Sequence, residues 1–519
     1  MTVTNLVLPN LYRDSVMLMR VSQELEKLDG VRRATAMMGT PNNRSLLNDA
    51  GLLTDEGDTA SPNDLILAIE ASPTLNSISV VSRAQELLRG ETVPRGPGNE
   101  HGVRSISGAL ENMPDANLTL ISVPGQYAAY EAAKALDLGL NVFLFSDNVS
   151  IEDEVALKTK AMDSGLLMLG PDCGTAVVGG MPLGFANAVS TGRVGLVSAS
   201  GTGLQQVMCL LDAAGEGVSQ ALGVGGRDLD DRVGGMMMMK CLGLLDSDPE
   251  TDVIVLISKP PGGRTRQRVL EALSQCSKPC VVCFLGVEKS PEVPGVYFES
   301  RLDGTARRAL ELLGSGSGAD RRMEDPFNVR LLMELDQGLG DSRLIRGLYS
   351  GGTLRDEAVL VLRENGLGAV STEPEEHGAI SLEDDDREGR HRLVDLGDDS
   401  LTVGRPHPII DLRLRSEMLI GAASEHHVGI ILMDVVLGYG AHPDPASELA
   451  PVLRECQGIA DDRRRALAVV IVLCGPSGDP QSMAHQRAAL ESAGAIVVRS
   501  NAQAALIAAA LARGDLSLV

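Results

Sequence analysis

The feature that most constrains this chain is a regular alternation of continuous apolar runs with helical segments, which begins at Leu118. The runs LTLISV, NVFLFS and LLMLG are apolar at nearly every position rather than at alternate positions. Such runs are typical of parallel strands that are buried on both faces, with helices covering the sheet. The pattern therefore predicts an α/β protein with doubly wound parallel sheets.

The same order of strands and helices occurs twice in the later part of the chain. It begins at Arg193 with RVGLVSAS and begins again at Leu344 with LIRGLYS. A repeated order of this kind predicts two related flavodoxin-like units. A site at the junction of two such units would draw residues from both copies.

A chain of 519 residues is too long for a single core, so we expect several domains. The expected domains are a small α/β domain over 1–90, a Rossmann-like domain over 115–190, and two flavodoxin-like domains with parallel sheets over 191–312 and 340–519. Gly, Pro and charged residues over 89–102 and 314–326 are typical of loops and linkers. An acidic insertion over 383–391 enlarges the second flavodoxin-like unit.

The composition narrows the classes of partner. Aromatic residues make up 2% of the chain, Trp is absent, and the net charge is −24. These numbers argue against nucleic acid and against an anionic membrane surface. No apolar run reaches membrane-spanning length, the N-terminus lacks signal-peptide character, and eight Cys do not form a disulfide framework. We therefore expect a soluble cytoplasmic protein.

The densest cysteine cluster, Cys276, Cys280 and Cys283, lies in and before an expected strand. Residues three apart on a strand point to opposite faces, so this spacing favours buried thiols over a metal site. The run GGMMMMKCLGLL favours a packed helix or a subunit interface over a cofactor site. No metal site is predicted.

One Gly-rich bend follows the first strand of each flavodoxin-like copy. The bends contain Ser200, Gly201, Thr202 and Gly203 in the first copy, and Gly351, Gly352 and Thr353 in the second. Such a bend at a helix N-terminus can bind an anion such as phosphate through backbone N–H groups, or can be merely a capped turn. A serine-nucleophile turn is disfavoured, because the leading Gly is missing and no His lies between His101 and His377.

A third bend in the second copy contains Gly438, Gly440 and His442. It follows another apolar run and offers the same choice between an anion site and a turn. His442 could donate to an anion or move a proton, although a lone loop His is more often only solvated. His407 lies in a Pro-rich loop and has the same two interpretations, whereas His426 and His427 favour the surface.

Further candidate substrate-binding residues lie where strands give way to loops or helices. Ligands of open α/β sheets bind beyond the carboxyl ends of the strands. The candidates there are Asn148, Asp172 and Cys173, together with the candidate anion clamps Arg13, Arg227 and Arg405. Any strand-to-helix turn needs small polar residues, so these candidates also have a purely structural interpretation.

Several of these segments, taken together, resemble a known family. The segments are GLLMLGPDCGTAV, GRVGLVSASGTG, GVGGRDL, LDSDPETDVIVLISKPP, HRLVDLGDD, GIILMDVVLGYG, LYRDSVMLM, LFSDNVSIEDE, LIRGLYSGGTL and GRPHPIID. The first four resemble the α subunit of succinyl-CoA synthetase, and the two that follow resemble the ligase domain of its β subunit. Along its whole length the chain resembles the FdrA family, so the Rossmann-like domain is expected to be CoA-binding-type and the flavodoxin-like domains ligase-type.

The resemblance implies a function, and the departures from the pattern restrict it. In succinyl-CoA synthetase two helix N-termini face a phosphohistidine; by motif they correspond to Ser200–Gly203 and to the Gly438–His442 bend. Here the histidine segment GHAGA, a nucleotide-binding ATP-grasp domain and a clean glycine-rich CoA loop are all missing. FdrA members have been linked to oxamate carbamoyltransferase, a multi-subunit enzyme of anaerobic allantoin breakdown that converts oxalurate and phosphate to oxamate and carbamoyl phosphate.

That reaction needs a phosphate site, oxyanion stabilisation by N–H donors and one acid, for which His442 or His407 is the best candidate. Phosphate is then expected as a substrate, and Mg²⁺ is an optional cofactor. Partner subunits in a hetero-oligomer are expected. Two other interpretations stay open: an ADP-forming acyl-CoA synthetase subunit that uses CoA and ATP, and a non-catalytic scaffold subunit.

Overall fold

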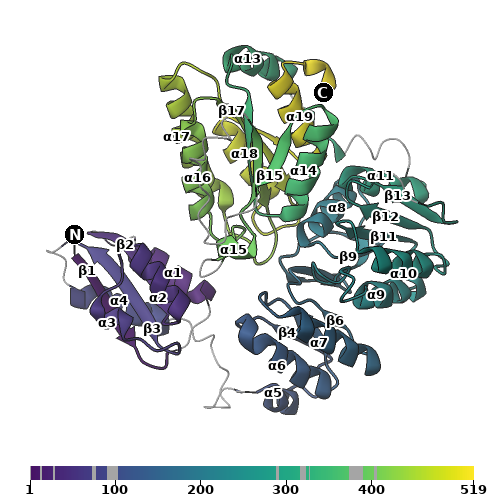
Figure 1. Cartoon of the computed structure of the whole chain (residues 1–519), viewed down its shortest axis with the longest axis horizontal. Helices are drawn as coiled ribbons and strands as arrows, with labels where there is room; N and C mark the ends of the chain where they lie inside the picture. Colours follow the sequence, from purple (N-terminus) through teal and green to yellow (C-terminus); the bar gives the residue numbers. More distant parts are fainter. Residues whose placement is uncertain are drawn as a thin grey trace. The chain divides into compact units, whose positions relative to one another are not determined.

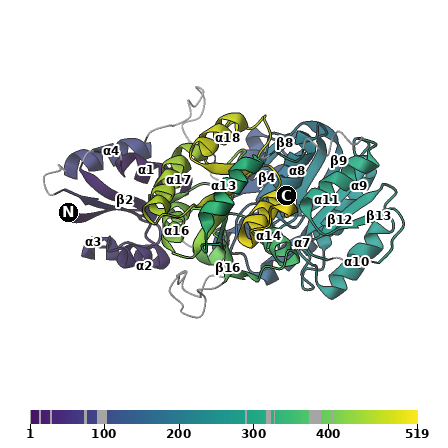
Figure 2. The same cartoon turned by 90° about the horizontal axis from the view of Figure 1, so that it is seen from above.

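The computed structural model of the chain is shown in Figure 1 and, from above, in Figure 2. It describes residues 2–11, 15–26, 28, 30–72, 77–89, 103, 105–287, 291–315, 323–326, 328–372, 390–402 and 406–519. The chain divides into two compact units, Met1–Arg104 with Thr402–Pro406, and Ser105–Leu401 with His407–Val519. The predicted α/β class is confirmed in both.

The first unit is built on a three-stranded antiparallel sheet in the order β1-β3-β2. Its elements are β1 (Thr2–Leu8), α1 (Ser15–Glu26), β2 (Val31–Met38), α2 (Pro41–Asp49), α3 (Asp55–Asp58), β3 (Leu65–Ala71) and α4 (Ser77–Arg89). Alternate residues of the central strand β3 face two different cores. Leu65 packs in the core of α1 and α4, whereas Ile66 packs in the core that contains Leu47 of α2.

The second unit begins with a small parallel sheet in the order β4-β5-β6. Its elements are α5 (Ile106–Asn112), β4 (Leu118–Ile121), α6 (Gly125–Asp137), β5 (Asn141–Leu144), α7 (Ile151–Asp163) and β6 (Met168–Leu169). Val142 and Phe143 on the central strand β5 are buried, but Leu120 is half exposed because β4 is an edge strand. The expectation of burial on both faces therefore holds for β5 and not for β4.

A seven-stranded sheet follows, in the order β13-β12-β11-β9-β10-β7-β8. Its elements are β7 (Thr175–Val178), β8 (Met181–Gly184), β9 (Thr191–Ser198), α8 (Gly201–Ala213), β10 (Val218–Gly223), α9 (Met236–Ser247), β11 (Val253–Ser258), α10 (Gly263–Leu273), β12 (Cys280–Phe284), β13 (Val296–Glu299) and α11 (Leu302–Leu312). The five strands from β13 to β10 are parallel, and the β7–β8 hairpin adds antiparallel to β10. Figure 1 shows α8 and α11 on one face of this sheet and α9 and α10 on the other.

The last sheet has six parallel strands in the order β15-β16-β14-β17-β18-β19. Its elements are α13 (Val329–Leu339), β14 (Leu344–Tyr349), α14 (Gly352–Glu364), β15 (Ala369–Thr372), β16 (His391–Asp395), α15 (Asp399–Thr402), α16 (Arg413–Ser424), β17 (Val428–Val436), α17 (Pro445–Asp462), β18 (Ala468–Cys474), α18 (Met483–Ser492), β19 (Ala495–Val498), α19 (Asn501–Arg513) and the 3₁₀ turn η2 (Leu516–Leu518). Helices α14 and α19 cover one face, and α16, α17 and α18 cover the other.

The two larger sheets share one strand order. Counted along the chain, β9 to β13 lie in the order 2-1-3-4-5, and so do β14 with β16 to β19, with β15 added at the edge. This is the flavodoxin-like order, whose ligand site lies where the first strand meets the third, the switch point of the sheet. The two copies pack through α8, α11, α14 and α19, which contribute to a single hydrophobic core.

Most of the Cys and Met residues considered in the sequence are buried. Cys280 and Cys283 lie in β12 and are buried free thiols, as predicted, whereas Cys276 is only partly buried. Met237 and Met238 are buried in α9, which agrees with a packed helix.

Among the residues that the structure describes, no helix combines the length and apolar character needed to span a bilayer. The expected loop over 89–102 and the acidic insertion over 383–391 lie almost wholly outside the described residues.

Candidate functional site

The candidate site is centred on the first strand-to-helix bend of each flavodoxin-like copy. Ser200 is the N-cap of α8 after β9, and Gly351 is the N-cap of α14 after β14. Both bends lie at the carboxyl end of the first strand of their sheet, which is the switch point. The sequence-predicted bends are therefore at the position where open α/β sheets bind ligands.

The structure brings these two bends into direct contact. Ser200 Oγ accepts a hydrogen bond from Gly203 N at 3.0 Å and donates to Thr353 Oγ1 at 2.6 Å. In the reciprocal contact, a Cβ built on Gly351 would lie 2.4 Å from the side chain of Thr202. The N-cap of each helix thus meets the second helical residue of the other, and both contacts involve a hydroxyl side chain.

Several backbone donors in these two first turns are not used inside the protein. The first N–H groups of a helix have no partner within the helix. Among the described residues, the N–H groups of Gly201, Thr202, Gly352 and Thr353 form no hydrogen bond. The two dipoles and their free donors make this region favourable for an anion.

Two charged side chains, which the sequence analysis did not single out, lie over the start of α14. A Cβ built on Gly352 would lie 2.5 Å from Asp395 Oδ2 and 3.5 Å from Lys259 Nζ. Lys259 follows β11, the neighbour of β9, and Asp395 ends β16, the neighbour of β14. Each sheet therefore contributes one charged residue from a strand next to its first strand.

Two charged residues of α14, Arg355 and Asp356, belong to the same cluster. Lys259 Nζ lies 2.9 Å from Asp356 Oδ2, and Arg355, which is buried, donates from Nε to Asp356 Oδ1 at 2.8 Å. Burial raises the pKa of Asp395 to about 6, although Arg355, the Gly397 N–H and Lys259 lower it; Asp434 raises it further. A carboxyl group with this pKa can exchange a proton near neutral pH.

A buried ion pair positions the α14 bend. Asp434 in β17 accepts hydrogen bonds from Ser350 N at 2.8 Å, Ser350 Oγ at 2.9 Å and Arg415 Nη2 at 2.9 Å. Asp434 and Arg415 have almost no solvent exposure. Because Ser350 directly precedes the N-cap Gly351, this network fixes the direction in which α14 begins.

The third predicted bend, at Gly438 to His442, has a different environment. Gly438 N donates to Gln481 Oε1 at 3.1 Å, and Tyr439 N donates to Ala186 O at 2.8 Å. The bend thus packs against the segment before β9, and these two N–H groups are already used. The resemblance predicted that Ser200–Gly203 would be paired with this bend; the contact that the structure shows is with Gly351–Thr353.

Both ring nitrogens of His442 have local partners. Asp444 N donates to Nδ1 at 3.1 Å, and Nε2 lies 3.0 Å from Glu448 Oε1, both at the start of α17. His407 Nδ1 accepts from Ile409 N at 3.3 Å, while burial and Arg415 lower the pKa of His407 to about 4. The catalytic roles of His442 and His407 remain predictions. His426 and His427 are exposed, as predicted.

The candidates near β5 and β6 form a second group. Asn148 and Asp172 have positive φ angles of 54° and 53°, a conformation that is uncommon outside glycine. The Cys173 thiol is buried and donates to Gly223 O at 3.2 Å, and burial raises its pKa to about 12. Arg13 and Arg405 lie outside the described residues.

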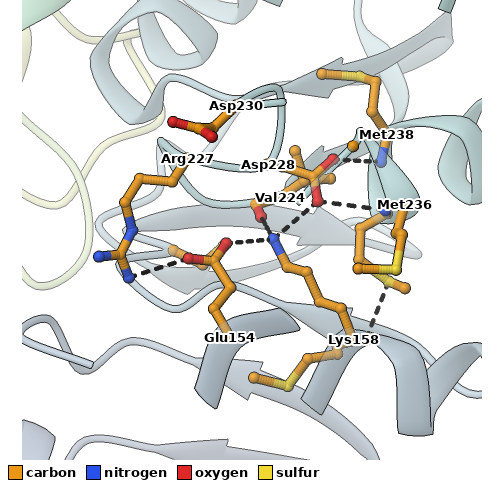
Figure 3. Close-up of polar contacts among 12 residues, drawn as sticks. Glu154, Lys158, Val224, Arg227, Asp228, Asp230, Met236 and Met238 are labelled. Atoms are coloured by element: carbon orange, nitrogen blue, oxygen red, sulfur yellow. Dashed lines mark hydrogen bonds and ion pairs between the residues drawn. The ribbon is translucent and has the colours of Figure 1, made fainter. Parts of the chain in front are cut away.

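Arg227 belongs to a charged network, shown in Figure 3. Its Nη2 lies 3.0 Å from Glu154 Oε2 and donates to Val149 O at 2.8 Å. Glu154 also binds Lys158, which in turn contacts Asp228. The structure therefore gives Arg227 an internal role in joining α7 to the loop after β10, and its predicted role in substrate binding remains untested.

The start of α6 does not fit the diphosphate of CoA. A Cβ built on Gly125, the first residue of α6, would lie 2.3 Å from Asp147 O and 2.6 Å from Asn148 O. These carbonyl oxygens pack closely against the start of α6. The chain between 105 and 190 also lacks the G-x-G-x-x-G bend that holds such a group.

The comparisons with known proteins match both ends of the chain. Residues 1–102 match the family model described as AllF, heavy metal-associated domain, and residues 348–511 match the CoA-ligase model. Residues 1–102 contain no Cys, and the described residues contain no group of three His, Cys, Asp or Glu side chains that could hold a metal ion. Soft metals prefer thiolate ligands, so residues 1–102 do not provide the kind of site that such a metal needs.

Two relatives are similar over long stretches. The uncharacterized protein YahF of Escherichia coli (strain K12) is 39% identical over 510 residues, which is 98% of each chain. Succinate–CoA ligase (ADP-forming) subunit alpha 2 of Archaeoglobus fulgidus is 32% identical over 218 residues, 39% of this chain and 73% of that protein. Among solved structures, the apo dinucleotide-forming acetyl-coenzyme A synthetase 1 of Ca. Korarchaeum cryptofilum is 16% identical, with a TM-score of 0.32, over 78% of this chain and 84% of that one.

The sequence contained a signal for the two charged residues that were missed. Lys259 directly follows an apolar run and Asp395 ends one. In a parallel sheet these positions lie at the ligand-binding edge. A single Lys or Asp at a strand end is common, and only the contact between the two copies shows that both lie over Gly352.

Proposed function

The chain belongs to the FdrA family of succinyl-CoA-synthetase-like proteins, and on this premise we propose that it is a carbamoyltransferase subunit. Its reaction converts oxalurate and phosphate to oxamate and carbamoyl phosphate. The acyl-CoA-synthetase-like scaffold supplies two related halves, and the site lies where their first helices meet.

The observation that carries the proposal is the group of residues around Gly352. Lys259 and Asp395 lie over it, and it begins α14, whose N-cap contacts the first turn of α8. A lysine beside the N-termini of two helices is a suitable site for phosphate. The two halves of the scaffold both contribute, which is the arrangement expected of a site at a junction of repeated units.

The chemistry is consistent with the residues present. Phosphate itself attacks the carbamoyl carbon, so no protein nucleophile is needed, and no His lies between His101 and His377. The backbone donors then stabilise the oxyanion of the tetrahedral intermediate, at about 3–4 kcal/mol for each donor in known oxyanion holes. Phosphate is a substrate of this reaction.

A second candidate is an ADP-forming acyl-CoA ligase subunit. The 32% identity to a succinate–CoA ligase α subunit favours it. The missing glycine-rich bend disfavours CoA binding. A third candidate is a non-catalytic scaffold subunit, in which the group around Gly352 has no chemical role.

The test uses the full chain together with the subunits that copurify with it. We expect carbamoyl phosphate to form from oxalurate and phosphate, and expect Lys259→Met to reduce the rate by at least about 10-fold at limiting phosphate. Arg264→Met is the matched control, because Arg264 is a largely exposed cation on the next helix, α10. CoA-dependent ATP hydrolysis without carbamoyl phosphate would support the ligase instead. Equal rates in Lys259→Met, Thr202→Val and wild type would support the scaffold.

A further inference from the structure

We infer that Asp395 transfers the proton in this reaction, from the attacking phosphate to the leaving nitrogen, and that Lys259 holds the phosphate beside it. The inference rests on the proposed function. It assigns the acid–base role to a residue at the junction of the two flavodoxin-like copies.

The two oxygens of Asp395 have different environments. Gly397 N donates to Oδ1 at 3.0 Å, which fixes the carboxyl group at the end of β16. Oδ2 lies over Gly352, at the start of α14, 2.5 Å from the position of a Cβ built on that residue. One oxygen is therefore held by the protein, and the other is directed to the position where an anion would meet the free N–H groups of the helix.

The charged groups that act on Asp395 come from three elements. Arg355 comes from α14, Lys259 follows β11 and pairs with Asp356 of α14, and Asp434 comes from β17. On the loop side, a Cβ built on Gly397 would lie 2.7 Å from His407 Nε2.

Burial raises the pKa of Asp395 to about 6, although the cations Arg355 and Lys259 lower it. At pH 7 to 8 the group is mostly the carboxylate, and it takes up a proton readily when one is offered.

The proton balance of the reaction requires such a group. Hydrogen phosphate attacks the carbamoyl carbon of oxalurate, and the new C–O bond forms while the C–N bond to the oxamate nitrogen breaks. The proton of hydrogen phosphate passes to Asp395 and then to that nitrogen, so the products are oxamate and carbamoyl phosphate. No oxidant, reductant or other reactant is needed, and Asp395 returns to its starting state.

The two histidines considered from the sequence are less suited to this role. Both nitrogens of His442 already have partners in the first turn of α17. His407 uses Nδ1 internally, and its pKa of about 4 makes it a weak base at neutral pH. Asp395 combines a suitable pKa with an oxygen directed at the helix N-terminus.

The test measures kcat/KM for carbamoyl phosphate formation between pH 5 and pH 9 in the assembled complex. For wild type we expect kcat/KM to rise as pH increases through about 6, because the reacting form is the carboxylate. Asp395→Asn should reduce kcat/KM by ~100-fold or more and remove this rise, since general acid–base catalysis contributes 10²–10⁴-fold. Asp395→Glu should restore part of the rate and a pH inflection, which a purely structural role would not explain.

Asp398→Asn is the matched control on the same loop, because Asp398 Oδ1 accepts a hydrogen bond from Ser400 N. The pH profile of Asp398→Asn should match that of wild type. Lys259→Met should raise KM for phosphate at least 10-fold and keep a pH inflection, displaced to higher pH because Lys259 lowers the pKa of Asp395. An active wild type with Asp395→Asn within three-fold of it and the same inflection would overturn the inference alone. A wild-type complex that forms no carbamoyl phosphate would overturn the proposed function and, with it, this inference.

Discussion

Thr202 packs so closely against Gly351 that a Cβ on Gly351 would lie 2.4 Å from the Thr202 side chain. This contact and its counterpart between Ser200 and Thr353 join the first helices of the two flavodoxin-like copies. The candidate site therefore depends on a close fit between the halves as well as on free donors.

The first prediction concerns that fit. Gly351→Ala should lower the free energy of unfolding by about 1–3 kcal/mol, because the added methyl group overlaps a β-branched side chain. Gly243→Ala is the control: Gly243 lies inside α9 with open space around its Cα, and Ala there should stabilise by about 0.5–1 kcal/mol. Urea unfolding of the full chain measures both. A neutral Gly351→Ala would show that the two bends are not in contact.

The second prediction concerns the hydrogen bond between Ser200 and Thr353. Ser200→Ala alone should cost about 1–2 kcal/mol, because Ser200 also caps α8 through Gly203 N. In a double-mutant cycle with Thr353→Val, the coupling energy should be about 0.5–1.5 kcal/mol. Denaturant unfolding of the four proteins gives this value. Additive effects of the two substitutions would contradict the contact.

A third prediction follows from the network in Figure 3. Lys158 Nζ contacts Glu154 Oε1 at 2.7 Å, Asp228 Oδ1 at 2.8 Å and Val224 O at 3.0 Å, and its side chain is fully buried. Lys158→Met should destabilise the protein by about 3–5 kcal/mol, because it leaves the buried Asp228 without a cation and Glu154 with Arg227 alone.

Lys160→Met on the same helix tests whether this loss is specific. Lys160 pairs with Asp137 at the surface, so the change should cost less than about 1 kcal/mol. Thermal unfolding of both variants supplies the comparison. Similar losses for the two lysines would mean that the buried network does not stabilise the fold.

A fourth prediction uses a buried carboxyl group at the junction of the copies. Glu357 on α14 accepts from Leu302 N at 2.7 Å and from Asn501 Nδ2 at 2.8 Å, and burial raises its pKa to about 7. Between its ordinary value of 4.5 and about 7 the folded state binds the proton and the unfolded state does not. The stability from this group is therefore complete below pH 4.5 and is lost as pH rises through 7.

The measurement is the melting temperature at pH 6 and pH 8. Wild type should lose more stability than Glu357→Gln when the pH is raised between these values. Other titrating groups contribute to both proteins, so the difference between the two slopes isolates Glu357. Parallel slopes for wild type and Glu357→Gln would contradict the assignment.

The sequence was sufficient to predict the class of the fold and the two Gly-rich bends, because both depend on local patterns. Continuous apolar runs predicted the parallel strands, and the Ser/Gly/Thr clusters predicted the starts of α8 and α14. The β7–β8 hairpin was missed, although Gly179 and Gly180 between two apolar segments are typical of a two-residue turn.

The pairing of the bends could not be predicted from the sequence. Whether Ser200 meets Gly351–Thr353 or Gly438 depends on how α8, α11, α14 and α19 pack into one core. Lys259 and Asp395 are 136 residues apart in the chain, and their approach to Gly352 results from that packing. No local pattern contains this information.

The central claim is that phosphate binds where the two copies meet, beside Lys259. Titration calorimetry of inorganic phosphate binding to the full chain at low ionic strength tests this claim most directly. We predict saturable binding to wild type and to Arg264→Met, and at least about 10-fold weaker binding to Lys259→Met. Saturable binding of equal strength in all three proteins, or no binding to wild type, would contradict the account.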